Sequence, residues 1–127
     1  FLLASRLSGL MRASEFPDRY VVNVSAVEGQ FQRVYKSPYH PHTNMAKAAL
    51  NMLVKTASIE VARTHPQAVL VALHPGTVNS ALSAPFNGAE IGRPAADAAG
   101  DMLRVLDGLP AEQTGSFHAY SGEPLPW

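Results

Sequence analysis

The sequence predicts an α/β fold in which helices flank a parallel sheet. Segments with the apolar spacing of helices alternate with short runs rich in β-branched residues, and clusters of Gly, Pro, Asn and Ser separate them. The 127 residues contain no internal repeat and no low-complexity tract. Strands separated by helices favour parallel pairing, because each helix supplies the right-handed crossover that parallel neighbours require.

The chain opens with a predicted helix, a strand and a loop. Residues 20–25 are a β-branched run suited to a buried parallel strand. Residues 26–42 contain two prolines and are predicted to form a loop. The helix is expected over residues 1–14, and Pro17 prevents its continuation. Its apolar positions, close to helical period, are Leu2, Leu3, Leu7, Leu10 and Met11.

The longest helix is expected over residues 43–63, which are dense in alanine and are followed by Pro66. Residues 75–92 are rich in Gly, Pro, Asn and Ser, and we expect a mobile loop there over a ligand site. The remaining predicted elements are a strand over 68–73, a helix over 94–106 with proline in its first turn, and a strand over 116–120.

Composition excludes several classes of function. Lys and Arg total 10, as do Asp and Glu, so no charge bias favours nucleic acid as a partner. There is no cysteine, hence no disulfide and no thiolate zinc site. Arg6 breaks the apolar start well short of a membrane span, and no signal-peptide cleavage pattern follows it. We therefore expect a cytoplasmic protein with neither a membrane nor a nucleic-acid partner.

Two histidines and one lysine are candidates for chemistry. His40 and His42 have a spacing that a metal could use in a strand, but no carboxylate or third histidine is near, so no metal site is predicted. Lys47 lies on an otherwise apolar helix face and shares that face with Thr43, four residues earlier. Lys47 is therefore either a functional residue or an ordinary surface lysine.

The segment around Lys47, TNMAKAALNM over residues 43–52, resembles the active-site helix of the short-chain dehydrogenase/reductase family. That family has a Tyr-x-x-x-Lys pair here, in which the lysine lowers the pKa of the phenol and binds the nicotinamide ribose. Lys47 is kept, but Thr43 stands at the tyrosine position. A threonine hydroxyl is a much weaker acid and is too short to reach the same carbonyl.

Two further motifs extend the resemblance. Residues 19–29 are similar to the strand that ends in the family's Asn-x-Ser-Ser-x-x-Gly motif, with Asn23 in an expected structural role and Ala26 at the second serine. Residues 74–80, HPGTVNS, resemble the Pro-Gly-x-Val-x-Thr loop that holds the nicotinamide carboxamide. The resemblance implies cofactor binding by Lys47, Pro75, Gly76, Thr77, Val78 and Ser80.

The resemblance also implies an architecture. Residues 1–127 would be the C-terminal part of a single Rossmann-type domain, that is, the C-terminal half of a doubly wound parallel sheet with flanking helices. The family's glycine-rich turn, which binds NAD or NADP, would precede Phe1. The last residues, 115–127, are similar to the tail of the C-factor-like carbonyl reductase branch.

The proton donor is the open question. Tyr39 in the loop before the helix is the first candidate, because Pro38 and Pro41 stiffen its surroundings; the alternative is that Tyr39 is an exposed loop residue. Two functions follow. One is an NAD(P)-dependent oxidoreductase acting on a small carbonyl or alcohol, with Lys47, Thr43 and Tyr39 as catalytic candidates. The other is a nucleotide-binding pseudoenzyme or dimeric scaffold.

Self-association is a further expectation. The alanine-rich face of residues 46–62 would let a second copy of the helix approach closely, and family members commonly pair this helix across a two-fold axis. A homodimer or homotetramer is expected on that basis. The alternative is that the same face packs inside one subunit.

Overall fold

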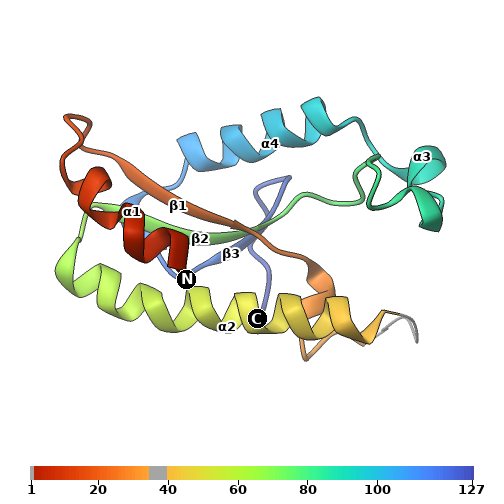
Figure 1. Cartoon of the computed structure of the whole chain (residues 1–127), viewed down its shortest axis with the longest axis horizontal. Helices are drawn as coiled ribbons and strands as arrows, with labels where there is room; N and C mark the ends of the chain where they lie inside the picture. Colours follow the sequence, from red (N-terminus) through yellow and green to blue (C-terminus); the bar gives the residue numbers. More distant parts are fainter. Residues whose placement is uncertain (1, 35–39) are drawn as a thin grey trace.

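The computed structural model describes residues 2–34 and 40–127. Three parallel strands form one sheet in the order β1-β2-β3, as Figure 1 shows. The strands are β1 (Arg19–Val24), β2 (Ala68–His74) and β3 (Phe117–Ala119). The predicted parallel α/β sheet is therefore confirmed.

The pairing of β1 with β2 defines the sheet. It runs in register from Arg19 opposite Ala68 to Val24 opposite Leu73. Beyond the strand, the Ser25 amide donates to the Leu73 carbonyl at 2.7 Å. Strand β2 lies between the other two and is buried along its middle, as expected for a parallel strand with helices on both faces.

Two long helices cover the two faces of the sheet, α2 (Pro41–Thr64) on one and α4 (Ala95–Asp107) on the other (Figure 1). Alternate residues of β2 point to opposite faces and supply two separate apolar clusters. The cluster under α2 contains Val54, Leu70, Ala72 and Phe117, and the cluster under α4 contains Val69, Val71 and Leu73 with Met102 and Val105 packed against it.

Helix α1 (Leu2–Arg12) forms where it was predicted but buries none of its residues. Helix α2 begins at Pro41 rather than at residue 43, because proline is well suited to the first turn of a helix. Within the predicted loop over 26–42, Val27–Gly29 is a short 3-10 helix, η1. The predicted loop therefore includes one short helical turn.

The loop expected over residues 75–92 also includes regular structure. The segment contains two short helices, η2 (Ala84–Phe86) and α3 (Gly88–Ile91). The Ser83 hydroxyl donates to the Val78 carbonyl at 2.5 Å and accepts from the Ser80 amide at 3.0 Å. These hydrogen bonds of Ser83 stabilise helical structure in a segment whose composition predicts only turns.

The C-terminal tail closes the α2 side of the core. After a third 3-10 helix, η3 (Ala111–Gln113), β3 leads into the tail. The rings of Phe117 and Trp127 stack with centroids 5.6 Å apart. The buried Gln30 donates from Nε2 to the Pro126 carbonyl at 2.6 Å. The tail thereby joins the end of the sheet to the segment after η1.

None of the helices in residues 2–34 and 40–127 combines the length and apolar character needed to cross a bilayer. The cytoplasmic location expected from the sequence stays a prediction.

Truncation of Phe117 tests the importance of the α2-side cluster. Phe117 is 1% exposed, so we expect Phe117→Ala to lower the free energy of unfolding by about 3–5 kcal/mol through lost apolar contact and a residual cavity. Urea denaturation measures the change. The matched control is Phe16→Ala, because Phe16 is 77% exposed and its loss should cost less than about 0.5 kcal/mol. Equal effects of the two variants would contradict the assigned core.

Candidate functional site

The candidate site lies at the carboxyl edge, the edge of the sheet formed by the C-terminal ends of β1 and β2. The two ends lie side by side because the strands are parallel and paired in register. In open α/β sheets, ligands bind outside the carboxyl ends of the strands. Three segments converge on this edge: η1, the N-terminal half of α2, and the 75–80 loop that follows β2.

Lys47 reaches the carboxyl edge from α2. Its ammonium donates from Nζ to the Val24 carbonyl at 2.8 Å, at the last residue of β1. Close contact between η1 and the backbone of α2 fixes this geometry. A Cβ added at Gly29 would lie 2.7 Å from the carbonyl carbon of Lys47, so only glycine fits between the two elements. The Val24 carbonyl and the close packing of η1 against α2 therefore hold Lys47 at the carboxyl edge.

A buried polar pair joins β1 to α2 one turn beyond Lys47. The Ser25 hydroxyl donates to Oδ1 of Asn51, and both residues are almost fully buried. Within the described residues, Nδ2 of Asn51 has no hydrogen-bond partner. Sequence reasoning missed this pair; the available signal was an asparagine on the helix face that carries Lys47. Asn23, expected to be structural, lies on β1 opposite Ala72.

His74, the last residue of β2, was not predicted to be a site residue. Its Nδ1 atom is buried and makes no hydrogen bond within the described part of the chain. Burial lowers the pKa of the His74 imidazole below its usual 6.5 because it disfavours the charged form; Glu28 opposes this shift and Arg33 adds to it. The imidazole is consequently neutral at pH 7.

The 75–80 loop is held by its backbone. Gly76 has a φ of 76°, in the left-handed region that favours glycine. The Thr77 carbonyl accepts from the Arg93 amide at 3.0 Å, and the Asn79 amide donates to the Arg93 carbonyl at 2.9 Å. Val78 and Arg93 thus form an isolated parallel bridge. Thr77 and Ser80 are exposed, and the Ser80 hydroxyl lies 3.3 Å from the Ser83 hydroxyl.

The positions that depart from the family pattern flank Lys47. Thr43 lies one turn before it on α2, and Ala26 directly precedes η1. Neither supplies a phenol or a serine hydroxyl at the carboxyl edge. Tyr39, the predicted substitute donor, lies outside the described residues, as does Tyr35. The role proposed for Tyr39 stays a prediction.

The start of α2 contacts the segment that follows the 75–80 loop. The rings of His40 and Phe86 meet edge to face with centroids 4.3 Å apart, and those of His40 and His42 are 6.0 Å apart. Among the residues that the structure describes, no three His, Cys, Asp or Glu side chains are grouped as a metal would require. The His40 ring packs against the rings of both His42 and Phe86.

Comparison with known proteins gives the same architecture. No family model matches the chain. C-signal from Myxococcus xanthus is 42% identical over 84 residues, which cover 65% of this chain and 46% of that protein. The NADPH-bound carbonyl reductase from chicken fatty liver superposes with a TM-score of 0.78 at 29% identity, over 99% of this chain and 52% of that one. Carbonyl reductase Sniffer of D. melanogaster, at 24% identity, shares the fold with a TM-score of 0.76, over 98% of this chain and 51% of that one.

The parallel sheet, its flanking helices and the carboxyl edge define half of a doubly wound Rossmann-type α/β fold. The chain spans about half the length of the relatives that it matches. It belongs to the short-chain dehydrogenase/reductase family, in the branch of C-signal and carbonyl reductases.

The partly buried imidazole of His74 predicts a pH dependence of stability. Because the pKa of His74 in the folded state lies below its unfolded value of 6.5, the unfolded state binds more protons between the two values. Stability should therefore fall as the pH drops from about 6.5 through the folded-state pKa. Urea denaturation at pH 7.5 and pH 5 measures this loss, which should be smaller in His74→Asn. Parallel pH profiles for parent and variant would show that His74 does not contribute.

Proposed function

We propose that the protein containing this chain binds NAD or NADP and catalyses hydride transfer between the nicotinamide and a small carbonyl or alcohol. On this proposal, residues 1–127 are the C-terminal part of a single Rossmann-type domain. The observation that carries it is the 2.8 Å hydrogen bond from Lys47 Nζ to the Val24 carbonyl, which holds an ammonium at the carboxyl edge beside the 75–80 loop. A structural relative at 29% identity was crystallised with NADPH bound.

The residues at the edge fit such a cofactor. Lys47 has ammonium protons to donate to ribose hydroxyls, since only one is used by the Val24 carbonyl. The exposed hydroxyls of Thr77 and Ser80 would bind the carboxamide, with Pro75, Gly76 and Val78 shaping the loop around it. The dinucleotide, when bound, supplies or accepts the hydride. The chain's own residues bind it, orient it and exclude water.

Proton transfer to the substrate oxygen needs a group other than the usual phenol. With Thr43 in place of tyrosine and Ala26 in place of serine, the proton would come from Tyr39 or from a bound water near Lys47. The same double replacement favours the second candidate function, a nucleotide-binding pseudoenzyme or dimeric scaffold. Both candidates retain the cofactor site and differ only in catalysis.

We also propose a homodimer or homotetramer built on α2. Three large apolar residues of this helix are exposed at intervals of seven, Met45 at 67%, Met52 at 58% and Ile59 at 73%. This spacing places them on one helix face, which matches the seam of paired helices. Most apolar residues of α1 are exposed as well, namely Leu2, Leu3, Leu7 and Leu10. A second copy would bury these faces.

Removing the ammonium tests cofactor binding. In the whole protein, Lys47→Ala should weaken NAD or NADP binding by about 1.5–3 kcal/mol, because a charge-assisted hydrogen bond to the ribose is lost. Calorimetric titration measures this change. Lys55→Ala is the matched control, since Lys55 is exposed on the same helix two turns further on. Equal affinities of the parent and Lys47→Ala would make Lys47 an ordinary surface lysine.

Restoring the missing groups separates enzyme from pseudoenzyme. If proton donation has been lost, Thr43→Tyr combined with Ala26→Ser should raise carbonyl reduction by about 10²–10⁴-fold, since general acid catalysis typically contributes that much. A panel of carbonyl substrates assayed with NADH and NADPH measures the gain.

Proton donation by Tyr39 would give a different result in the same assay. If its phenol donates the proton, the parent is already active, Tyr39→Phe abolishes the activity, and Thr43→Val leaves it nearly unchanged. Absence of activity in the parent and in every variant would contradict both catalytic accounts and favour the scaffold.

A further inference from the structure

We propose that Tyr120, Arg93 and Asp101 form a clamp that fixes the conformation of the 75–80 loop and thereby positions it for the dinucleotide. The three are positioning residues, and the cofactor part of the inference rests on the proposed function. Tyr120 follows β3 directly, and its amide donates to the His74 carbonyl at 2.9 Å. The ring is thus attached to the strand end from which the loop departs.

The first contact of the clamp is between Tyr120 and Gly76. A Cβ added at Gly76 would lie 2.9 Å from Cε1 and 3.2 Å from Cδ1 of the Tyr120 ring. The loop backbone therefore passes directly against the aromatic ring, and both the positive φ and this contact require glycine. A ring at this position defines how closely the loop can approach β3.

The second contact is between Tyr120 and Arg93. The Arg93 guanidinium carbon lies 4.2 Å from the ring centroid, within the range of a cation–π interaction. The backbone of Arg93 forms the two hydrogen bonds, described above, that hold Thr77 and Asn79. One residue therefore binds both the loop and the ring that supports the loop.

The third contact orients Arg93. Its Nη2 atom donates to a carboxylate oxygen of Asp101 on α4, and the side chains of Arg93 and Asp101 are 26% and 14% exposed. The other carboxylate oxygen accepts from Arg104, whose side chain is 75% exposed. Asp101 thus holds the guanidinium over the ring, and Arg104 adds a second ion pair to the same carboxylate.

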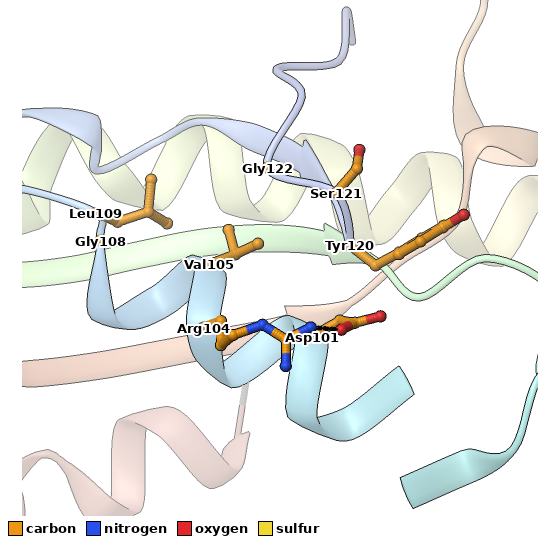
Figure 2. A pocket seen from close by; sticks show the side chains of 8 residues that line it. All are labelled: Asp101, Arg104, Val105, Gly108, Leu109, Tyr120, Ser121 and Gly122. Atoms are coloured by element: carbon orange, nitrogen blue, oxygen red, sulfur yellow. Dashed lines mark hydrogen bonds and ion pairs between the residues drawn. The ribbon is translucent and has the colours of Figure 1, made fainter. Parts of the chain in front are cut away.

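The Tyr120 ring borders open space, so its contacts with Gly76 and Arg93 are needed to hold the ring in place. A cavity of about 460 Å³ lies between α4 and the residues after β3, and Tyr120 lines it (Figure 2). Figure 2 shows the ring extending from the end of β3, with Asp101 and Arg104 on α4. Because packing from the cavity side is missing, Gly76 and Arg93 supply the contacts that fix the ring.

Hydrogen exchange at two amides tests the clamp in the whole protein. The reporters are the amides of Arg93 and Asn79, which bond across the bridge between the loop and Arg93. In Tyr120→Leu and in Arg93→Leu, we expect both amides to exchange about tenfold faster than in the parent. The Val71 amide in the buried strand β2 should keep its parental rate, which separates local opening from general destabilisation.

Two variants serve as controls. Tyr120→Phe keeps the aromatic face and should retain near-parental exchange. Arg104→Ala removes a guanidinium from the same carboxylate but keeps the Arg93–Asp101 ion pair, and should also leave the two loop amides unchanged. Unchanged exchange in Tyr120→Leu, or equal acceleration in Arg104→Ala, would overturn the clamp.

Cofactor affinity tests the second half of the inference. In calorimetric titration with NAD and NADP, Tyr120→Leu should weaken binding about tenfold while Tyr120→Phe binds like the parent. Faster loop exchange with unchanged affinity would overturn the link to the cofactor. A parent that binds neither dinucleotide would instead refute the proposed function and with it this link, and the exchange rates would still decide whether the clamp holds the loop.

Discussion

The parallel pairing of β1 with β2 is the constraint on which the rest of the structure depends. It aligns Val24 with Leu73, so that the carbonyl bound by Lys47 and the start of the 75–80 loop lie at one edge. It also fixes which side chains face which helix. A slip by one residue would exchange the two faces and would place Leu70 and Ala72 under α4 instead of α2. Core packing and site geometry are therefore set by the same register.

Much of this architecture could be predicted from local sequence pattern. The β-branched run at β1 and the apolar run at β2 are strong strand signals, and the alanine-rich stretch is a strong helix signal. Lys47 was predicted as a site residue from the resemblance of residues 43–52 to the family's active-site helix, because its place on an apolar helix face left an ordinary surface lysine equally open. Where pattern and packing agree, element type follows from the sequence.

The rest depends on contacts between distant residues, and no local pattern encodes them. The close approach of Gly29 to Lys47, the Ser25–Asn51 pair and the stacking of Arg93 on Tyr120 each join different elements. The short helices after the 75–80 loop were missed for a related reason, since their residues favour turns until the Ser83 hydroxyl bonds to the loop. His74 was missed because only the fold buries its Nδ1 atom.

On the proposed function, the carboxyl edge of β1 and β2 binds a nicotinamide dinucleotide through Lys47 and the 75–80 loop. The most direct measurement is a crystal structure of the whole protein grown with saturating NADP. We expect a ribose hydroxyl within about 3.2 Å of Lys47 Nζ and the carboxamide against the hydroxyls of Thr77 and Ser80. A dinucleotide bound elsewhere, with Lys47 donating only to the Val24 carbonyl, would contradict it.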